Sequence, residues 1–179
     1  MRISKTALNR GWIWATASGV IVYAILTLLD LQLKSVTGVS TANLEGLSGA
    51  LQYRLAFHAW APEPYAARAG FLLGFAYLAM PLYALSFFFS GVIVAEQFTP
   101  GKNRFRRWVL LAAMVAPVGA LLDAGLKAAE LAMLLGGADD GFARIAAGLS
   151  QAKTVAVMVG FVLLMGAVMA RFAARKKKD

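Results

Sequence analysis

Four long apolar stretches, separated by shorter polar segments, dominate the pattern of this chain. They cover residues 12–31, 69–95, 108–135 and 154–172. A run of about 20 apolar residues in a helix spans a bilayer core of about 30 Å. The pattern therefore predicts an all-α membrane protein, with four transmembrane helices in a single membrane domain that covers residues 1–179.

Turn-forming residues set the expected limits of these helices. Pro64 suits the first turn of the second helix, "TPGKN" turns the chain after it, and Gly136 or Gly137 can end the third. Asp139 or Asp140 can cap the helix that follows. We therefore expect helices over about 12–31, 65–98, 107–135 and 142–173.

The connection after the first helix carries an apolar pattern of its own. Leu44, Leu47, Leu51 and Leu55 recur at helical spacing within "NLEGLSGALQYRLAFHAW". This spacing predicts an amphipathic helix within residues 42–60, which lies on the membrane or caps the bundle.

The amino-acid composition supports a membrane protein and argues against several kinds of functional site. Hydrophobic residues make up 60% of the chain, against about 45–50% in an average soluble protein. The chain has no cysteine and one histidine, His58, so disulfides, thiol chemistry and imidazole-based metal sites are not expected. No phosphate loop or nucleophile elbow appears, so we assign no cofactor, no metal and no catalytic residue.

Basic residues determine the expected topology. The net charge of +9 comes from clusters before the first helix, between the second and third, and after the fourth. Lys and Arg accumulate on the cytoplasmic side, so we expect both termini there, with the segment 42–60 outside. These residues would meet anionic lipid headgroups, which makes membrane lipids the expected partner rather than nucleic acid.

The third helix carries three ionisable residues inside an apolar run, "GALLDAGLKAAELAML". At about 100° per residue, Asp123, Lys127 and Glu130 fall within about 60° of one another. The same face continues toward the cytoplasm with Gly119 and Ala116, and small residues let helices pack closely in lipid. We therefore expect close packing in the inner half and a charged region in the outer half.

Polar residues on the other helices lie at similar depths. At about 1.5 Å per residue, Asp30 of the first helix and Lys153 of the fourth are level with Lys127 and Glu130, and together they can form a ring above Asp123. Tyr23 shares a polar face of the first helix with Asp30, and Tyr77 shares a face of the second with Pro81, so we expect both tyrosines to line the same site. The candidate ligand-binding residues are Asp123, Glu130, Lys127, Asp30, Tyr23, Tyr77 and Lys153.

Three interpretations of these charges remain open. Insertion of an Asp at the centre of a transmembrane helix into the membrane costs about 2.5–3.5 kcal/mol. Pairing of Asp123 with Lys127, one turn away, could offset part of that cost. In the first interpretation, such pairs form a structural ladder that binds nothing. In the second, the charges line a polar pocket open to the outside. In the third, Lys127 and Glu130 extend to the membrane interface.

Three classes of function follow from these interpretations. The protein binds or transports a small cation, amine or proton; or it is a membrane enzyme that acts on a lipid or isoprenoid, with Asp123 or Glu130 as acid or base; or it is a structural or assembly subunit of a membrane complex. A second copy of the chain is a further candidate partner.

Several short motifs resemble those of uncharacterised four-helix bacterial inner-membrane proteins. They are "LLDLQ" at the end of the first helix, "MPLYAL" in the second, "LLDAGLKAAELAML" in the third and a lysine that enters the fourth. The resemblance implies a multi-pass protein of the bacterial inner membrane and no named activity.

Overall fold

The structure, a computed structural model, describes the backbone of residues 5–97 and 104–176 and the side chains up to residue 169. The described elements are all helical: α1 (Lys5–Thr37), η1 (Thr41–Gly46, a 3₁₀ helix), α2 (Ala50–Trp60), α3 (Tyr65–Ala95), α4 (Arg104–Gly136) and α5 (Asp140–Lys176). Four of them, α1, α3, α4 and α5, are long and apolar enough to cross a membrane. The prediction of an all-helical chain with four such helices is confirmed.

The four long helices extend beyond the apolar stretches that predicted them. They contain 31 to 37 residues. At about 1.5 Å per residue, 33 residues measure about 50 Å, against about 30 Å of hydrocarbon. Their polar ends therefore reach past the bilayer core. The predicted end of the second helix at residue 98, and the basic residues Arg2, Lys102, Lys177 and Lys178, lie outside the described residues.

Glycine and aspartate residues end and begin these helices as their chemistry requires. Gly38 follows α1 with a φ of 78° and donates to the carbonyl of Lys34, while Gly137 follows α4 with a φ of 95°. Positive φ values favour glycine at helix C-termini. The Asp139 carboxylate accepts the N–H groups of Gly141 and Phe142 and so caps α5.

The connection between α1 and α3 forms two short helices instead of one amphipathic helix. Residues 47–49 separate η1 from α2, so the four leucines do not share a face. Leu44 is fully buried, whereas Leu51 and Leu55 are 70% and 65% exposed. The buried face of α2 consists of Ala50, Tyr53, Ala56 and Trp60 instead.

The helices divide into two compact units, of which the first comprises the described residues within 1–19, 81–120 and 154–179. Here α4 and α5 approach closely: a Cβ placed on Gly119 would lie 2.7 Å from that of Ala156. Ala116 is 2% exposed, so the predicted close packing on this face of α4 is confirmed. Side-chain hydrogen bonds join α1 to α3, from Trp12 to Ser90 (2.8 Å) and between Thr16 and Ser86 (2.7 Å).

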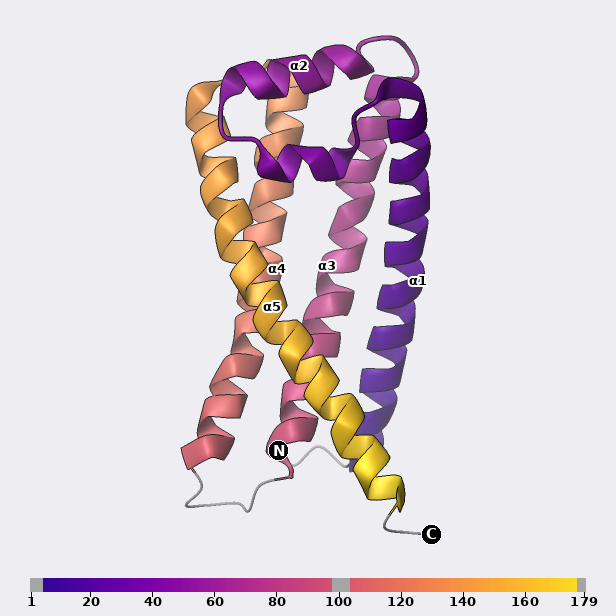
Figure 1. Cartoon of the computed structure of the whole chain (residues 1–179), viewed down its shortest axis with the longest axis vertical. Coiled ribbons are helices and arrows are strands. Elements are labelled where there is room, and N and C mark those ends of the chain that lie inside the picture. Colours follow the sequence, from indigo (N-terminus) through magenta and orange to yellow (C-terminus); the bar gives the residue numbers. More distant parts are fainter. Residues whose placement is uncertain (1–4, 98–103, 177–179) are drawn as a thin grey trace. The chain divides into compact units, whose positions relative to one another are not determined.

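The second unit comprises residues 20–80 and 121–153, and its core includes Leu44, Tyr53, Trp60, Leu73, Leu126 and Met133. Within this unit, α2 runs across the ends of the long helices rather than along them (Figure 1). Asp140 accepts the N–H of Ala50 at the start of α2, and Arg54 donates to the carbonyl of Ala138. These contacts fix α2 to the connection between α4 and α5.

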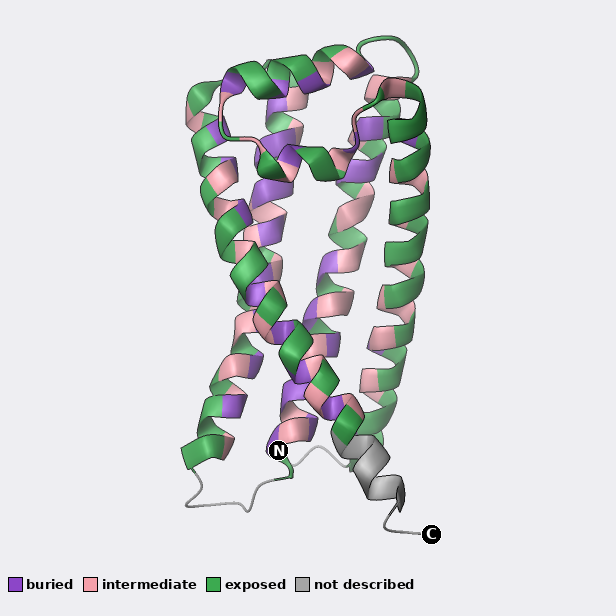
Figure 2. Cartoon of the chain, in the orientation of Figure 1, coloured by how far each residue is buried: buried purple, intermediate pink, exposed green. Residues whose placement is uncertain are grey.

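The first helix is far more exposed than the other three (Figure 2). Only 6% of its most apolar window is buried, against 39% for α3, 33% for α4 and 22% for α5. Large apolar side chains such as Ile21 and Leu28 are exposed along it. Such a surface suits contact with lipid tails.

Candidate functional site

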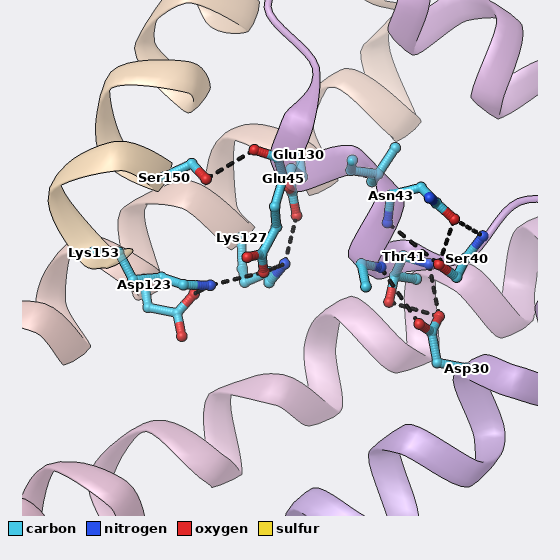
Figure 3. A network of polar contacts seen from close by, with 12 residues as sticks. Asp30, Ser40, Thr41, Asn43, Glu45, Asp123, Lys127, Glu130, Ser150 and Lys153 are labelled. Atoms are coloured by element: carbon cyan, nitrogen blue, oxygen red, sulfur yellow. Dashed lines mark hydrogen bonds and ion pairs between the residues drawn. The ribbon is translucent and has the colours of Figure 1, made fainter. Parts of the chain in front are cut away.

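Five charged side chains from three elements of the second unit meet in one cluster, which we call the charge cluster (Figure 3). Helix α4 supplies Asp123, Lys127 and Glu130, whose spacing keeps them on one face. Helix α5 supplies Lys153 and the short helix η1 supplies Glu45.

Each lysine of the charge cluster contacts two carboxylates. The Lys127 ammonium lies 2.9 Å from Glu45 Oε1 and 3.0 Å from Glu130 Oε2. The Lys153 ammonium lies 2.7 Å from the same oxygen of Glu45 and 3.0 Å from Asp123 Oδ1. Glu45 therefore bridges the two lysines, and each lysine also has a carboxylate partner on α4.

The members of the charge cluster differ in exposure. The Glu130 side chain is fully buried and that of Lys127 is 8% exposed. Asp123 and Lys153 are 12% and 13% exposed, whereas Glu45 reaches 31%. Ions buried in this way need partners, because removal from water costs several kcal/mol per ion. Glu45 is therefore the residue of the charge cluster with the greatest contact with solvent.

Within the part of the chain that the structure describes, one oxygen of the charge cluster has no hydrogen-bond partner. Glu130 Oε1 is buried and accepts no hydrogen bond from the described residues. A buried polar atom without a partner costs about 1–3 kcal/mol, and more when it is charged. Three carboxylates also face two ammonium groups, so the fully ionised cluster carries one negative charge in excess.

The segment that carries Glu45 is held by further hydrogen bonds. The Ser150 hydroxyl donates to the Glu45 carbonyl at 2.8 Å, and the Tyr53 hydroxyl donates to the Leu44 carbonyl at 3.2 Å. Burial and the nearby Glu130 carboxylate raise the pKa of Tyr53 to about 12, so this hydroxyl keeps its proton. Burial alone would raise the pKa of Glu45, but Lys127 and Lys153 outweigh it and hold this pKa below 4.5.

The structure brings four of the predicted site residues together, with partners that differ from the expected ones. Asp123 pairs with Lys153 of α5, whereas the sequence suggested Lys127 one turn away. Lys127 instead turns to Glu130 and Glu45. Tyr77 lies beside the cluster, since its hydroxyl donates to the Ala124 carbonyl at 3.0 Å.

Asp30 and Tyr23 occupy other positions. The Asp30 carboxylate accepts the backbone N–H of Thr41 at 2.6 Å and its hydroxyl at 2.8 Å, and thereby holds the start of η1. The predicted ring that included Asp30 is therefore wrong: backbone donors at the turn after α1 satisfy this carboxylate. Tyr23 is 70% exposed and is not part of the buried charge cluster.

Sequence reasoning missed Glu45. The charges of Asp123, Lys127, Glu130 and Lys153 balance without it, so the long helices gave no sign that a third carboxylate was needed. Glu45 also lies in an irregular connection, where helical periodicity cannot show which way a side chain points.

Comparisons with protein families, curated proteins and solved structures find no match to this chain. The class of the protein therefore follows from its own four apolar helices, which define a multi-pass helical membrane protein.

Proposed function

We propose that this multi-pass protein binds or transports a small cation, amine or proton at its charge cluster. The cluster would face the outside of a bacterial inner membrane, with both termini in the cytoplasm. The basic residues support this orientation: Lys5 and Arg10 lie near the start of α1, and Arg104, Arg106 and Arg107 lie at the start of α4. The positive-inside rule makes these helix ends cytoplasmic.

The observation that carries the proposal is that Glu130 Oε1 accepts no hydrogen bond from any residue that the structure describes. This atom is buried beside an excess of one negative charge. A bound cation, a protonated amine or a proton at Glu130 would balance the charge, and the first two would also give Oε1 a partner. An intramembrane acid in this situation is a default candidate for a functional site.

A structural role is the second candidate, and the ion pairs of the cluster favour it. Three ion pairs of 3.0 Å or less join η1, α4 and α5 to one another, and a fourth lies within α4. Such a cluster can fix the position of the connecting segment without binding anything. The two candidates differ in whether a cation or proton changes the stability of the folded protein.

The test measures the thermal stability of purified protein in detergent. Na⁺, K⁺, Li⁺ or methylammonium replaces the bulky cation N-methylglucamine at constant ionic strength, and a separate series varies the pH. A ligand that binds only the folded state raises the melting temperature in a saturable manner. We expect one of these cations, or the proton, to do so in the parent protein.

Glu130→Gln should abolish this response because it removes the charge and keeps the shape. Glu96→Gln makes the same change on an exposed residue and should keep the response. If Glu130→Gln does not fold, Glu130→Asp replaces it in the test. This variant keeps the carboxylate but moves it by one methylene, so the response should weaken and not disappear. Identical cation and pH responses in parent and Glu130→Gln would leave the structural candidate.

A further inference from the structure

Two ammonium groups of the charge cluster contact the same carboxylate oxygen, which belongs to a residue outside the long helices. Lys127 and Lys153 lie 2.9 Å and 2.7 Å from Glu45 Oε1 (Figure 3). Each lysine is also held by a buried carboxylate of α4, namely Glu130 or Asp123. These two pairs do not depend on Glu45, so each lysine would keep a carboxylate partner if Glu45 moved away.

Glu45 is attached to the cluster in a different way from the other four residues. It belongs to η1, a 3₁₀ helix of six residues, and its side chain is the most exposed of the five in the charge cluster. Gly38 and Gly49 lie on either side of this helix and Gly46 ends it, and a Cβ on any of the three would meet nothing within 4 Å. Hydrogen bonds from Ser150 and Tyr53 hold the backbone at Glu45 and Leu44, so displacement of Glu45 has to move its side chain out of the cluster or break these bonds.

The charge balance shows what would follow if Glu45 moved away. The remaining two lysines and two carboxylates are neutral overall. Each ammonium would lose one acceptor in a mostly buried place, which is costly for a charged donor. A carboxylate from another molecule, placed where Glu45 Oε1 now lies, would restore both contacts.

We propose that Lys127 and Lys153 form a binding site for a small carboxylate ligand, and that Glu45 is a tethered carboxylate which occupies this site until the ligand displaces it. The ligand would enter from the side of the membrane on which Thr41–Gly46 lies. This site goes beyond the proposed cation site, because it uses the lysines and does not require a ligand at Glu130.

The first experiment removes the tethered carboxylate and supplies a free one. Glu45→Ala should melt at a lower temperature than the parent, and propionate should restore the melting temperature in a saturable manner. Chloride at the same ionic strength should not. The variant that combines Glu45→Ala with Lys153→Met should not respond to propionate, since one of the two ammonium groups is gone. A response to both anions, or to neither, would overturn the proposal.

The second experiment tests displacement with Glu45 in place. The chain has no cysteine, so Leu44→Cys introduces one thiol at a position that is fully buried beside Glu45. If propionate displaces Glu45, the segment lifts and the rate of maleimide labelling rises several-fold. With Lys153→Met added, labelling should no longer depend on propionate. A labelling rate that propionate leaves unchanged in Leu44→Cys would show Glu45 to be a fixed structural partner.

Adding Glu130→Gln to Leu44→Cys separates this proposal from the cation site. The propionate dependence of labelling should persist in that variant, because both lysines remain and the glutamine amide oxygen can still accept a hydrogen bond from Lys127. Loss of the cation response with retention of the propionate response would support both proposals. Loss of the propionate response in this variant would contradict an independent carboxylate site.

Discussion

At the scale of single residues, three of the four ion pairs in the charge cluster join neighbouring elements, and only Lys127–Glu130 lies within one helix. Asp123 has a lysine one turn away on its own helix, yet it pairs with Lys153 of α5. Lys127 lies between Glu130 of α4 and Glu45 of η1. Breaking one of the pairs between elements should therefore loosen the contact between two helices.

The Asp123–Lys153 pair predicts non-additive substitutions. Lys153→Leu should lower stability by about 3–5 kcal/mol, because it removes an ammonium partner from a buried carboxylate. Combining it with Asp123→Leu should recover much of that loss, since apolar residues often replace a buried ion pair without cost. Unfolding of both variants and of Asp123→Leu in detergent measures the coupling. Effects that simply add would argue against the pair.

Glu45 predicts a stability that depends on acid pH. Its pKa is held below 4.5 in the folded protein by Lys127 and Lys153, against the opposing effect of burial. A lowered folded pKa contributes stability that is present above pH 4.5 and lost as the pH falls through the folded value. Melting temperatures between pH 7 and about 3 should therefore drop more steeply in the parent than in Glu45→Gln.

The exposed residue Glu96 provides the control for this pH series. Glu96→Gln removes a carboxylate that lies outside the charge cluster, so its pH profile should follow that of the parent. If Glu45→Gln showed the parent profile as well, the two ion pairs of Glu45 would contribute nothing measurable to stability.

At the scale of helices, periodicity predicted the interior of each long helix better than the connections. The stripe of Asp123, Lys127 and Glu130 follows from the helical step alone, and so does its small-residue continuation at Gly119. The hydrogen-bond partner of Asp30 is a backbone N–H in the turn after α1, and no periodic pattern predicts such a contact. The leucine stripe failed for the same reason, since η1 ends before Leu51 is reached.

The close contact between α4 and α5 predicts opposite results at two helix glycines. Gly119→Ala places a methyl group 2.7 Å from the Cβ of Ala156, and overpacking of this kind costs about 1–3 kcal/mol. Gly74→Ala enters open space on α3, and alanine favours a helix by up to about 1 kcal/mol over glycine. Thermal melting in detergent should show a loss for Gly119→Ala only. Equal melting temperatures would contradict this packing of α4 against α5.

At the scale of the whole molecule, the apolar helices determine that the chain crosses a membrane, and the basic residues are expected to determine its direction. The helices themselves would serve either orientation, because each exceeds the bilayer core in length. The orientation matters for both proposals, since it decides which side of the membrane would supply a cation to Glu130 or a carboxylate to Lys127 and Lys153.

Single cysteines in this cysteine-free chain test the orientation directly. Ser48 and Gln97 are both exposed and lie beyond opposite ends of α3. Ser48→Cys should react with a membrane-impermeant maleimide in intact bacterial cells, whereas Gln97→Cys, near the basic start of α4, should react only after permeabilisation. The reversed pattern would place the charge cluster on the cytoplasmic side. A small carboxylate or cation would then reach it from the cytoplasm, and the basic residues near Arg104 would lie outside against the positive-inside rule. Labelling of both positions in intact cells would contradict a membrane-spanning α3.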